Sequence, residues 1–161
     1  MTRHLAYLSL GTNLGNKEEN LRAAMKLIEE QIGDIVSQSA LYTSEPWGFT
    51  SENSFLNNVV AVSTTMTPEK LLETTQRIEF TLGRTRKSVN GQYADRLIDI
   101  DILFYDQQVT DTPTLTLPHP LLHRRLFVLE PLNQIAPTLT HPILKKDINT
   151  LCRELQEESA C

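Results

Sequence analysis

LIDIDILF, residues 97–104, is the most strand-like segment of the 161-residue sequence. Successive residues of a strand point to opposite faces of a sheet. The segment therefore predicts both of its aspartates on one face and its isoleucines, together with Phe104, on the other. Because an apolar face of this kind must pack against other elements, we expect a strand over 97–105 with one face in the core and two carboxylates on the opposite face.

The two carboxylates, Asp99 and Asp101, are the sharpest chemical signal in the sequence. Their α-carbons should lie about 7 Å apart, and the charges repel each other unless something positive lies between them. Hard oxygen ligands suit Mg²⁺, which usually takes one or two protein carboxylates together with phosphate oxygens. The alternative is a solvated polar face, although Asp is disfavoured in strands. A D-x-D strand equally suits a nuclease or a sugar-nucleotide transferase.

The elements on either side of this strand alternate in a regular order. Helix starts are predicted at Asn16, with Glu19 completing a capping box, and at Thr67, which precedes Pro68. The order strand, helix, strand, strand, helix, strand indicates an α+β fold, with an antiparallel or mixed sheet and helices on one face. The expected strands cover 5–10, 35–42, 55–65 and 97–105, the helices end at Gly33 and Gly83, a short helix begins near Leu121, and 147–157 is helical.

Composition narrows the class of protein. Apolar residues make up 40% and charged residues 22%, which is typical of a globular protein, and the length predicts a single domain over 1–161. A net charge of -5 argues against a general nucleic-acid binder. Cys152 and Cys161 lack metal-ligand spacing and fit a reducing compartment. No signal peptide or membrane span is evident, so we expect a soluble cytoplasmic protein, with a monomer as the default.

Polar residues near the aspartate strand are further candidates. A basic loop over 84–96, with Arg84, Arg86, Lys87 and Arg96, would suit a metal–polyphosphate complex beside the carboxylates, or it is simply solvated. Gln76 and Glu79 share one side of a predicted helix, where either could reach a nucleotide, but the residues alone favour plain surface. His119 lies between two prolines that restrict its backbone, or it is a helix-entry histidine without chemistry. Residues 11–17 do not match a standard phosphate loop.

Several segments together resemble the 6-hydroxymethyl-7,8-dihydropterin pyrophosphokinase family. The resemblance extends over almost the whole chain. It is carried by LSLGTNLG (8–15), QRIE (76–79) leading to GRTR (83–86), RLIDIDI (96–102), PHP (118–120), RLF (125–127) and PL (131–132). It implies a ferredoxin-like α+β fold. It also implies transfer of the β,γ-pyrophosphoryl group of ATP to the pterin hydroxymethyl oxygen, with release of AMP, as a step of folate biosynthesis.

The resemblance also implies roles for individual residues. Asp99 and Asp101 correspond to ligands of two Mg²⁺ ions, and they are implied as catalytic together with Arg86 and Arg96. The implied ATP site comprises Gln76, Glu79, Arg84, Arg86, Arg96, Ile102, His119 and Arg125. The implied pterin site comprises Ser44, Glu45, Trp47, Phe55, Asn57 and Phe127. Tyr93 stands roughly where the family often has a loop Trp. The loops over 44–53 and 84–96 are expected lids.

Two other classes remain open at this point. A different metal-dependent transferase or nuclease could use the same D-x-D strand. A non-catalytic ferredoxin-like binding module is the other reading, and there Phe55 and Phe127 would be ordinary core residues.

Overall fold

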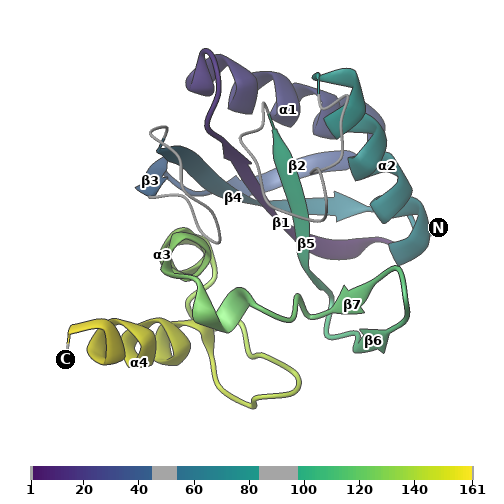
Figure 1. The fold of residues 1–161 in the computed structure, drawn as a ribbon. Coiled ribbons are helices and arrows are strands. Elements are labelled where there is room, and N and C mark those ends of the chain that lie inside the picture. The colour runs from purple at the N-terminus through teal and green to yellow at the C-terminus, as the bar shows by residue number, and fades with distance from the viewer. Residues whose placement is uncertain (1, 45–53, 84–97, 161) are drawn as a thin grey trace.

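The computed structural model describes residues 2–44, 54–83 and 98–160. Its main sheet has the strand order β2-β4-β1-β5, in which every neighbouring pair is antiparallel, and a short strand β3 pairs with β4 as well. The strands are β1 (His4–Thr12), β2 (Gly33–Gln38), β3 (Tyr42–Ser44), β4 (Phe55–Thr64) and β5 (Asp99–Tyr105). With α1 after β1 and α2 after β4, this order is the ferredoxin-like arrangement, and the predicted α+β fold is confirmed (Figure 1).

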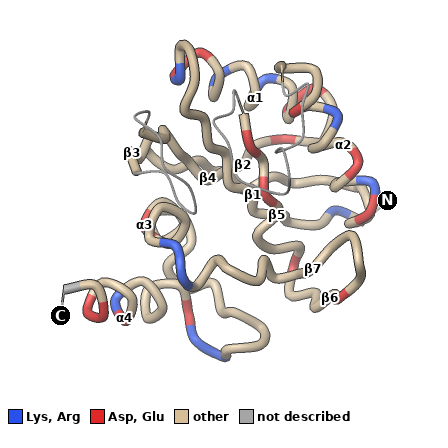
Figure 2. The backbone as a smooth tube through the Cα atoms, viewed as in Figure 1, with Lys and Arg blue, Asp and Glu red and all other residues tan. Residues whose placement is uncertain are grey.

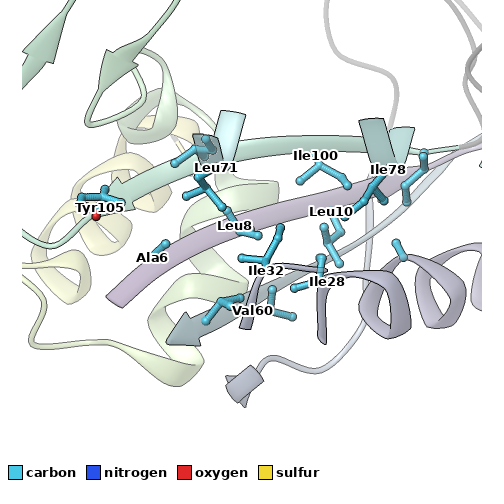
Figure 3. Close-up of a cluster of buried hydrophobic side chains, with 14 of the residues drawn as sticks. Ala6, Leu8, Leu10, Ile28, Ile32, Val60, Leu71, Ile78, Ile100 and Tyr105 are labelled. Carbon is cyan, nitrogen blue, oxygen red and sulfur yellow. The ribbon is translucent and has the colours of Figure 1, made fainter. Parts of the chain in front are cut away.

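The first two helices begin at the predicted caps. α1 (Lys17–Gln31) starts after Asn16, whose side-chain oxygen accepts from the Glu19 backbone N–H at 3.1 Å. α2 (Pro68–Thr81) starts after Thr67, whose hydroxyl accepts from the Lys70 N–H at 3.2 Å. Both helices cover the same face of the sheet. Buried apolar side chains from β1, β4, β5 and the two helices meet there and form the first core (Figure 3).

The opposite face of the sheet is partly covered by a second pair of helices. A 3-10 turn (Leu122–Arg124) leads into α3 (Leu126–Ile135), and α4 (Ile148–Ala160) packs against α3 (Figure 1). A second apolar cluster lies between them and the sheet and includes Val59, Leu103 and Leu129. The two helices of the predicted order, α1 and α2, thus lie on one face as expected, and α3 and α4 are additional helices that cover apolar residues of the other face.

A bulge in β5 changes the face of one predicted residue. Leu8 pairs with Ile102, but the next β1 residue toward the N-terminus, Tyr7, pairs with Phe104, so Leu103 is an extra residue in the ladder. A β-bulge shifts the alternation of side chains beyond it. Leu103 and Phe104 consequently both lie in the second cluster, and the prediction that Phe104 shares the face of the isoleucines is wrong.

The segment predicted as one strand over 35–42 is interrupted after Gln38. The Ser39 hydroxyl accepts from the Val59 N–H at 2.9 Å, and the Ala40 N–H donates to the Gln134 side chain of α3 at 2.8 Å. The chain therefore leaves the ladder and rejoins β4 as β3. A two-stranded hairpin, β6 (Thr110–Asp111) and β7 (Thr116–Leu117), was not anticipated. Within residues 2–44, 54–83 and 98–160, none of the helices combines the length and the apolar character that crossing a bilayer requires.

Candidate active site

The second face of the sheet carries polar residues beyond the part that α3 and α4 cover. Gly11, on the central strand β1, lies opposite Asn57 of β4 and opposite Asp99 of β5, so these three residues form one row across the sheet. Asp101 lies in the next row, opposite Ser9. Ile100 and Ile102 are buried on the other face. The two aspartates thus share a face as predicted, and they make the start of β5 acidic (Figure 2).

Arg125 lies beside the aspartate pair, although it is far from it in sequence. It immediately precedes α3, at a basic stretch of the chain visible in Figure 2. One of its guanidinium nitrogens is 3.8 Å from a carboxylate oxygen of Asp101, an ion-pair distance that is too long for a hydrogen bond. The guanidinium carbon is 5.6 Å from the centre of the Phe127 ring, within cation–π range. Arg125 is therefore held between an aspartate and an aromatic ring.

His119 is fixed by the backbone on both sides. Its own N–H donates to the Leu103 carbonyl at 2.9 Å, and its ring Nδ1 accepts from the Leu121 N–H at 3.1 Å. Because Nδ1 acts as an acceptor, the neutral ring carries its proton on Nε2. The pKa of His119 is lowered to about 4, mainly by burial and also by the charge of Arg125, while the charge of Asp99 partly opposes the shift. His119 is thus a neutral hydrogen-bond donor near the aspartates at pH 7.

We expect the His119 ring of the ligand-free protein to titrate near pH 4, well below the ordinary midpoint of about 6.5. Since the folded-state pKa is depressed, the stability that His119 contributes is present above pH 6.5 and is lost as the pH falls towards 4. NMR of the imidazole resonances measures the midpoint. Asp99→Asn should lower it further, because the Asp99 charge raises this pKa. A midpoint at or above 6.5 would contradict the assignment.

A pocket of about 250 Å³ opens beside Asp101, and we refer to it as the hairpin pocket. Three predicted residues, Asp101, Ile102 and His119, contribute to its wall. Sequence reasoning missed the rest of the wall, because it placed no hairpin after β5. Those remaining residues come from α2, β5, the β6–β7 hairpin and the residue after His119: Leu72, Ile100, Thr112, Pro113, Thr114, Leu115, Thr116 and Pro120.

A second pocket, of about 380 Å³, lies on the other side of Arg125, and we refer to it as the Phe127 pocket. Ser44, Arg125 and Phe127 line it, as do Tyr42 from β3 and Leu155 from α4. Phe127 is half-buried and faces this space, and Phe55 is half-buried as well. Phe127 also packs against the second apolar cluster, so it both lines this pocket and contacts the core. Arg125 lines the Phe127 pocket and lies 3.8 Å from Asp101, which lines the hairpin pocket, so this ion pair links the two pockets.

Asn57 is buried next to the Phe127 pocket and joins β4 to β3. Its side-chain N–H groups donate to the Ser44 hydroxyl at 2.8 Å and to the Tyr42 carbonyl at 3.0 Å. The Tyr42 hydroxyl in turn hydrogen-bonds the Glu130 carboxylate of α3, which raises the pKa of Tyr42 to about 12. Two predicted residues, Asn57 and Ser44, are thus in direct contact. Tyr42 belongs to the same hydrogen-bond network, and the sequence did not indicate it.

Gly11 is a further residue that the sequence analysis missed. A Cβ atom at this position would lie 2.9 Å from the Asn57 side-chain oxygen and 3.6 Å from the Phe55 ring. Glycine therefore allows the Asn57 side chain to lie close against the backbone of β1. A signal was available, because a glycine inside a strand often marks a close approach by a ligand or another backbone.

The remaining predicted residues lie on α2 or outside the described part of the chain. On α2, Gln76 is exposed, whereas Glu79 is buried and accepts from the Ile100 N–H at 2.8 Å. Glu45, Trp47, Arg84, Arg86 and Arg96 lie outside the described residues, as do Tyr93 and most of the two expected lids. Within the described ranges, no group of three or more His, Cys, Asp or Glu side chains could hold a metal ion. Mg²⁺ usually takes one or two protein carboxylates and completes its shell with water and substrate oxygens, so a pair of aspartates is a suitable donor set.

Comparisons with known proteins identify the family of the chain. Residues 7–137 match the family model for 7,8-dihydro-6-hydroxymethylpterin-pyrophosphokinase (HPPK). A 2-amino-4-hydroxy-6-hydroxymethyldihydropteridine pyrophosphokinase of Porphyromonas gingivalis is 46% identical over 139 residues, which cover 86% of this chain and 94% of that protein. The Bacillus subtilis protein of the same name is 39% identical over 134 residues, covering 83% of this chain and 78% of that protein.

Longer proteins are similar over part of their length. A folic acid synthesis protein of Dictyostelium discoideum is 39% identical over 148 residues, which cover 92% of this chain but 22% of that protein. The crystal structure of Plasmodium falciparum HPPK-DHPS superposes with a TM-score of 0.81 at 18% identity, covering 99% of this chain and 46% of that chain. This likeness shows the fold, and our chain spans less than half of that structure. By its sequence, the chain belongs to the 7,8-dihydro-6-hydroxymethylpterin-pyrophosphokinase family.

Proposed function

We propose that this chain transfers the pyrophosphoryl group of ATP to the hydroxymethyl oxygen of 6-hydroxymethyl-7,8-dihydropterin. The products are the pterin diphosphate and AMP, and the reaction is a step of folate biosynthesis. Family membership supports the reaction. The structural observation that carries the proposal is the position of Asp101 and Arg125 at the junction of two pockets, since a two-substrate transfer requires both substrates to meet at one charged centre.

We propose that Asp99 and Asp101 hold Mg²⁺, with two ions bound when ATP is present. The donor set fits, because the two partly exposed carboxylates on one face are hard oxygen ligands, and Mg²⁺ completes its shell with water and phosphate oxygens. Bound there, the metal would neutralise phosphate charge and lower the pKa of the attacking hydroxyl. The Arg125 guanidinium, close to Asp101, reduces the repulsion between the carboxylates.

The hairpin pocket is the proposed site of the nucleotide. Its apolar residues, including Ile102, offer a surface for a flat base, and Asp101 places the phosphate tail at its edge. His119 can donate from Nε2 to a phosphate oxygen without carrying a charge of its own. Arg125 would stabilise charge on the phosphates. The proposed roles of Gln76, Glu79, Arg84, Arg86 and Arg96 in ATP binding, and of Arg86 and Arg96 in catalysis, rest on the resemblance to the family.

The Phe127 pocket is the proposed site of the pterin. The two donors of Asn57 are already engaged by Ser44 and Tyr42, so its carbonyl oxygen is the atom that can accept from the amide-like edge of the pterin. The rings of Phe127 and Phe55 offer faces for a planar heterocycle. Glu45 and Trp47 are proposed for the same site from the resemblance alone.

We expect Phe127→Ala to raise the dissociation constant of the pterin about 2- to 12-fold, which corresponds to the roughly 0.5–1.5 kcal/mol of a stacked aromatic pair. ATP affinity should change little, because Phe127 does not line the hairpin pocket. Calorimetric titration of each substrate measures both constants. Phe104→Leu in the second core is the matched control for a lost ring and should leave both affinities close to wild type. An unchanged pterin affinity would show that Phe127 only packs.

The assay for the proposed function supplies ATP, Mg²⁺ and 6-hydroxymethyl-7,8-dihydropterin and separates the nucleotide products by chromatography. We expect AMP to form in step with the pterin diphosphate, and only when the divalent cation is present. Formation of ADP would indicate a different transferase. Turnover without the pterin would indicate a hydrolase, and an absence of turnover would favour a binding module.

Three broader features are proposed with this function. We propose that residues 1–161 act as one pyrophosphokinase domain, that the protein works as a monomer, and that it is cytoplasmic. The net charge of -5 and the cysteine content support a small-molecule enzyme in a reducing compartment. Sedimentation of the purified protein tests the monomer.

A further inference from the structure

Glu79, which the family resemblance assigns to the ATP site, is a buried carboxylate. It lies on the last part of α2 and is only 8% exposed. Glutamate is almost never buried to this extent unless its charge is compensated by a partner. One of its carboxylate oxygens accepts from the backbone N–H of Ile100 at 2.8 Å. Ile100 is the residue between Asp99 and Asp101, so this hydrogen bond reaches the centre of the aspartate pair.

The contact engages the outer edge of β5. Within the described sheet, β5 is the last strand in the order, and its inner neighbour is β1. Successive N–H groups along a strand point to opposite edges, so an Ile100 N–H that donates to α2 points away from β1. The ladder with β1 therefore does not satisfy this group. The Glu79 carboxylate thus accepts the hydrogen bond that a carbonyl group of a further strand would accept at this position.

Ile100 is consequently held from several directions. It lies opposite Leu10 of β1, its side chain is buried in the first core, and its N–H is bound by Glu79. The residues on either side of it have half-buried side chains on the open face. A shift of the backbone at Ile100 would change the separation of the two carboxylates. A cation bound between them depends on that separation.

We propose that Glu79 is a positioning residue, which holds the backbone between Asp99 and Asp101 so that both carboxylates keep the spacing that metal binding requires. This inference rests on the proposed function of the aspartate pair. It gives Glu79 a role other than direct contact with ATP phosphates. A carboxylate beside a polyphosphate is electrostatically unfavourable, and the Ile100 amide already engages one of its oxygens.

The test compares four variants with the wild-type chain. Glu79→Gln keeps an acceptor oxygen at the same reach, whereas Glu79→Leu removes it and Glu79→Asp keeps the charge on a side chain one methylene shorter. Ile78→Val, at the buried neighbour on the same helix, is the control for lost stability. Mn²⁺ affinity is measured by equilibrium dialysis with an ATP analogue that carries a methylene group between the α and β phosphorus atoms. Urea denaturation of each variant and hydrogen exchange of the Ile100 amide are measured in parallel.

We expect Glu79→Leu and Glu79→Asp to weaken Mn²⁺ binding about 10- to 100-fold. Losses of this size are usual when a residue that orients a metal ligand is removed. Their Ile100 amides should exchange faster. Glu79→Gln should remain within about threefold of wild type, and Ile78→Val should bind Mn²⁺ normally despite its lower urea midpoint. If Glu79→Leu does not fold, Glu79→Asp decides the question.

Two results would overturn the inference. Normal Mn²⁺ affinity in Glu79→Asp, together with fast exchange at Ile100, would show that the contact only stabilises the sheet. Equal losses of Mn²⁺ affinity in Glu79→Gln and Glu79→Asp would show that both the charge and the length of the side chain are needed, as for direct contact with the metal–nucleotide complex. Either result leaves the proposed function intact if the wild-type chain produces AMP. Failure of the wild type to produce AMP would reject the proposed function by itself.

Discussion

Replacing Asp99 or Asp101 by Ala should slow AMP formation by at least about 100-fold, the scale seen when a charge-stabilising group is removed from an active site. The two carboxylates share one face of β5, and the Arg125 guanidinium lies 3.8 Å from the Asp101 carboxylate. Each aspartate is therefore expected to be needed, because one carboxylate cannot replace the charge and the oxygen ligands of the other.

The Asn variants refine this prediction. Asp99→Asn and Asp101→Asn keep the shape of the side chain and remove its charge, so we expect losses of similar size and little change in the urea midpoint. Asp34→Ala, at an exposed aspartate of β2, is the control and should retain full activity. Near-normal turnover of both Ala variants would remove the assignment of the metal to this pair.

Gly11→Ala should raise the dissociation constant of the pterin by about 10- to 100-fold, the equivalent of one buried hydrogen-bond partner left unsatisfied. The added methyl group would lie 2.9 Å from the side-chain oxygen of Asn57, closer than a Cβ normally approaches. Asn57 cannot easily move away, because its N–H groups are bound to Ser44 and Tyr42. Its oxygen, the proposed acceptor for the pterin, must therefore shift or lose its partner.

A double-mutant cycle isolates this effect. In an Asn57→Ala background the oxygen is absent, so adding Gly11→Ala should cause little further loss of pterin affinity. ATP affinity should stay within about threefold in all three variants, because Gly11 does not line the hairpin pocket. Calorimetry measures both affinities. Additive losses in the double variant would show that Gly11 and Asn57 act independently, and the proposed crowding would be wrong.

Much of the fold could be predicted from local patterns. The caps at Asn16 and Thr67 are short side chains placed directly before apolar helical repeats, and both make the expected hydrogen bonds. The D-x-D alternation correctly placed the two aspartates on one face. These features depend on residues that are close together in sequence, which is why the sequence alone was sufficient.

The features that could not be predicted depend on contacts between distant segments. The bulge at Leu103 is defined only by the pairing of β5 with β1. The break after Gln38 depends on a hydroxyl–backbone contact with Val59 and on Gln134 of α3. A periodicity argument assumes that a strand continues for as long as its alternation does, so it cannot detect either change.

The candidate site likewise has residues that the sequence could identify and contacts that only the fold reveals. Residue types and the family resemblance identified Asp101, Ile102, His119, Ser44 and Phe127, and the structure brings these residues to the walls of two adjacent pockets. Glu79 was expected at the ATP site, but its burial against Ile100 could be seen only once α2 was packed on β5. The functions of these residues remain predictions for the experiments above.

The proposal that Asp99 and Asp101 hold the divalent cations is tested by counting the metal ions bound to the protein. Equilibrium dialysis with Mn²⁺ and the α,β-methylene analogue of ATP gives the number of ions bound per molecule of protein-bound nucleotide. We expect about two ions for the wild-type chain, as in other two-metal sites, and a clear loss when Asp99 and Asp101 are both replaced by Asn. An unchanged ratio in that double variant, at full nucleotide occupancy, would contradict the proposal.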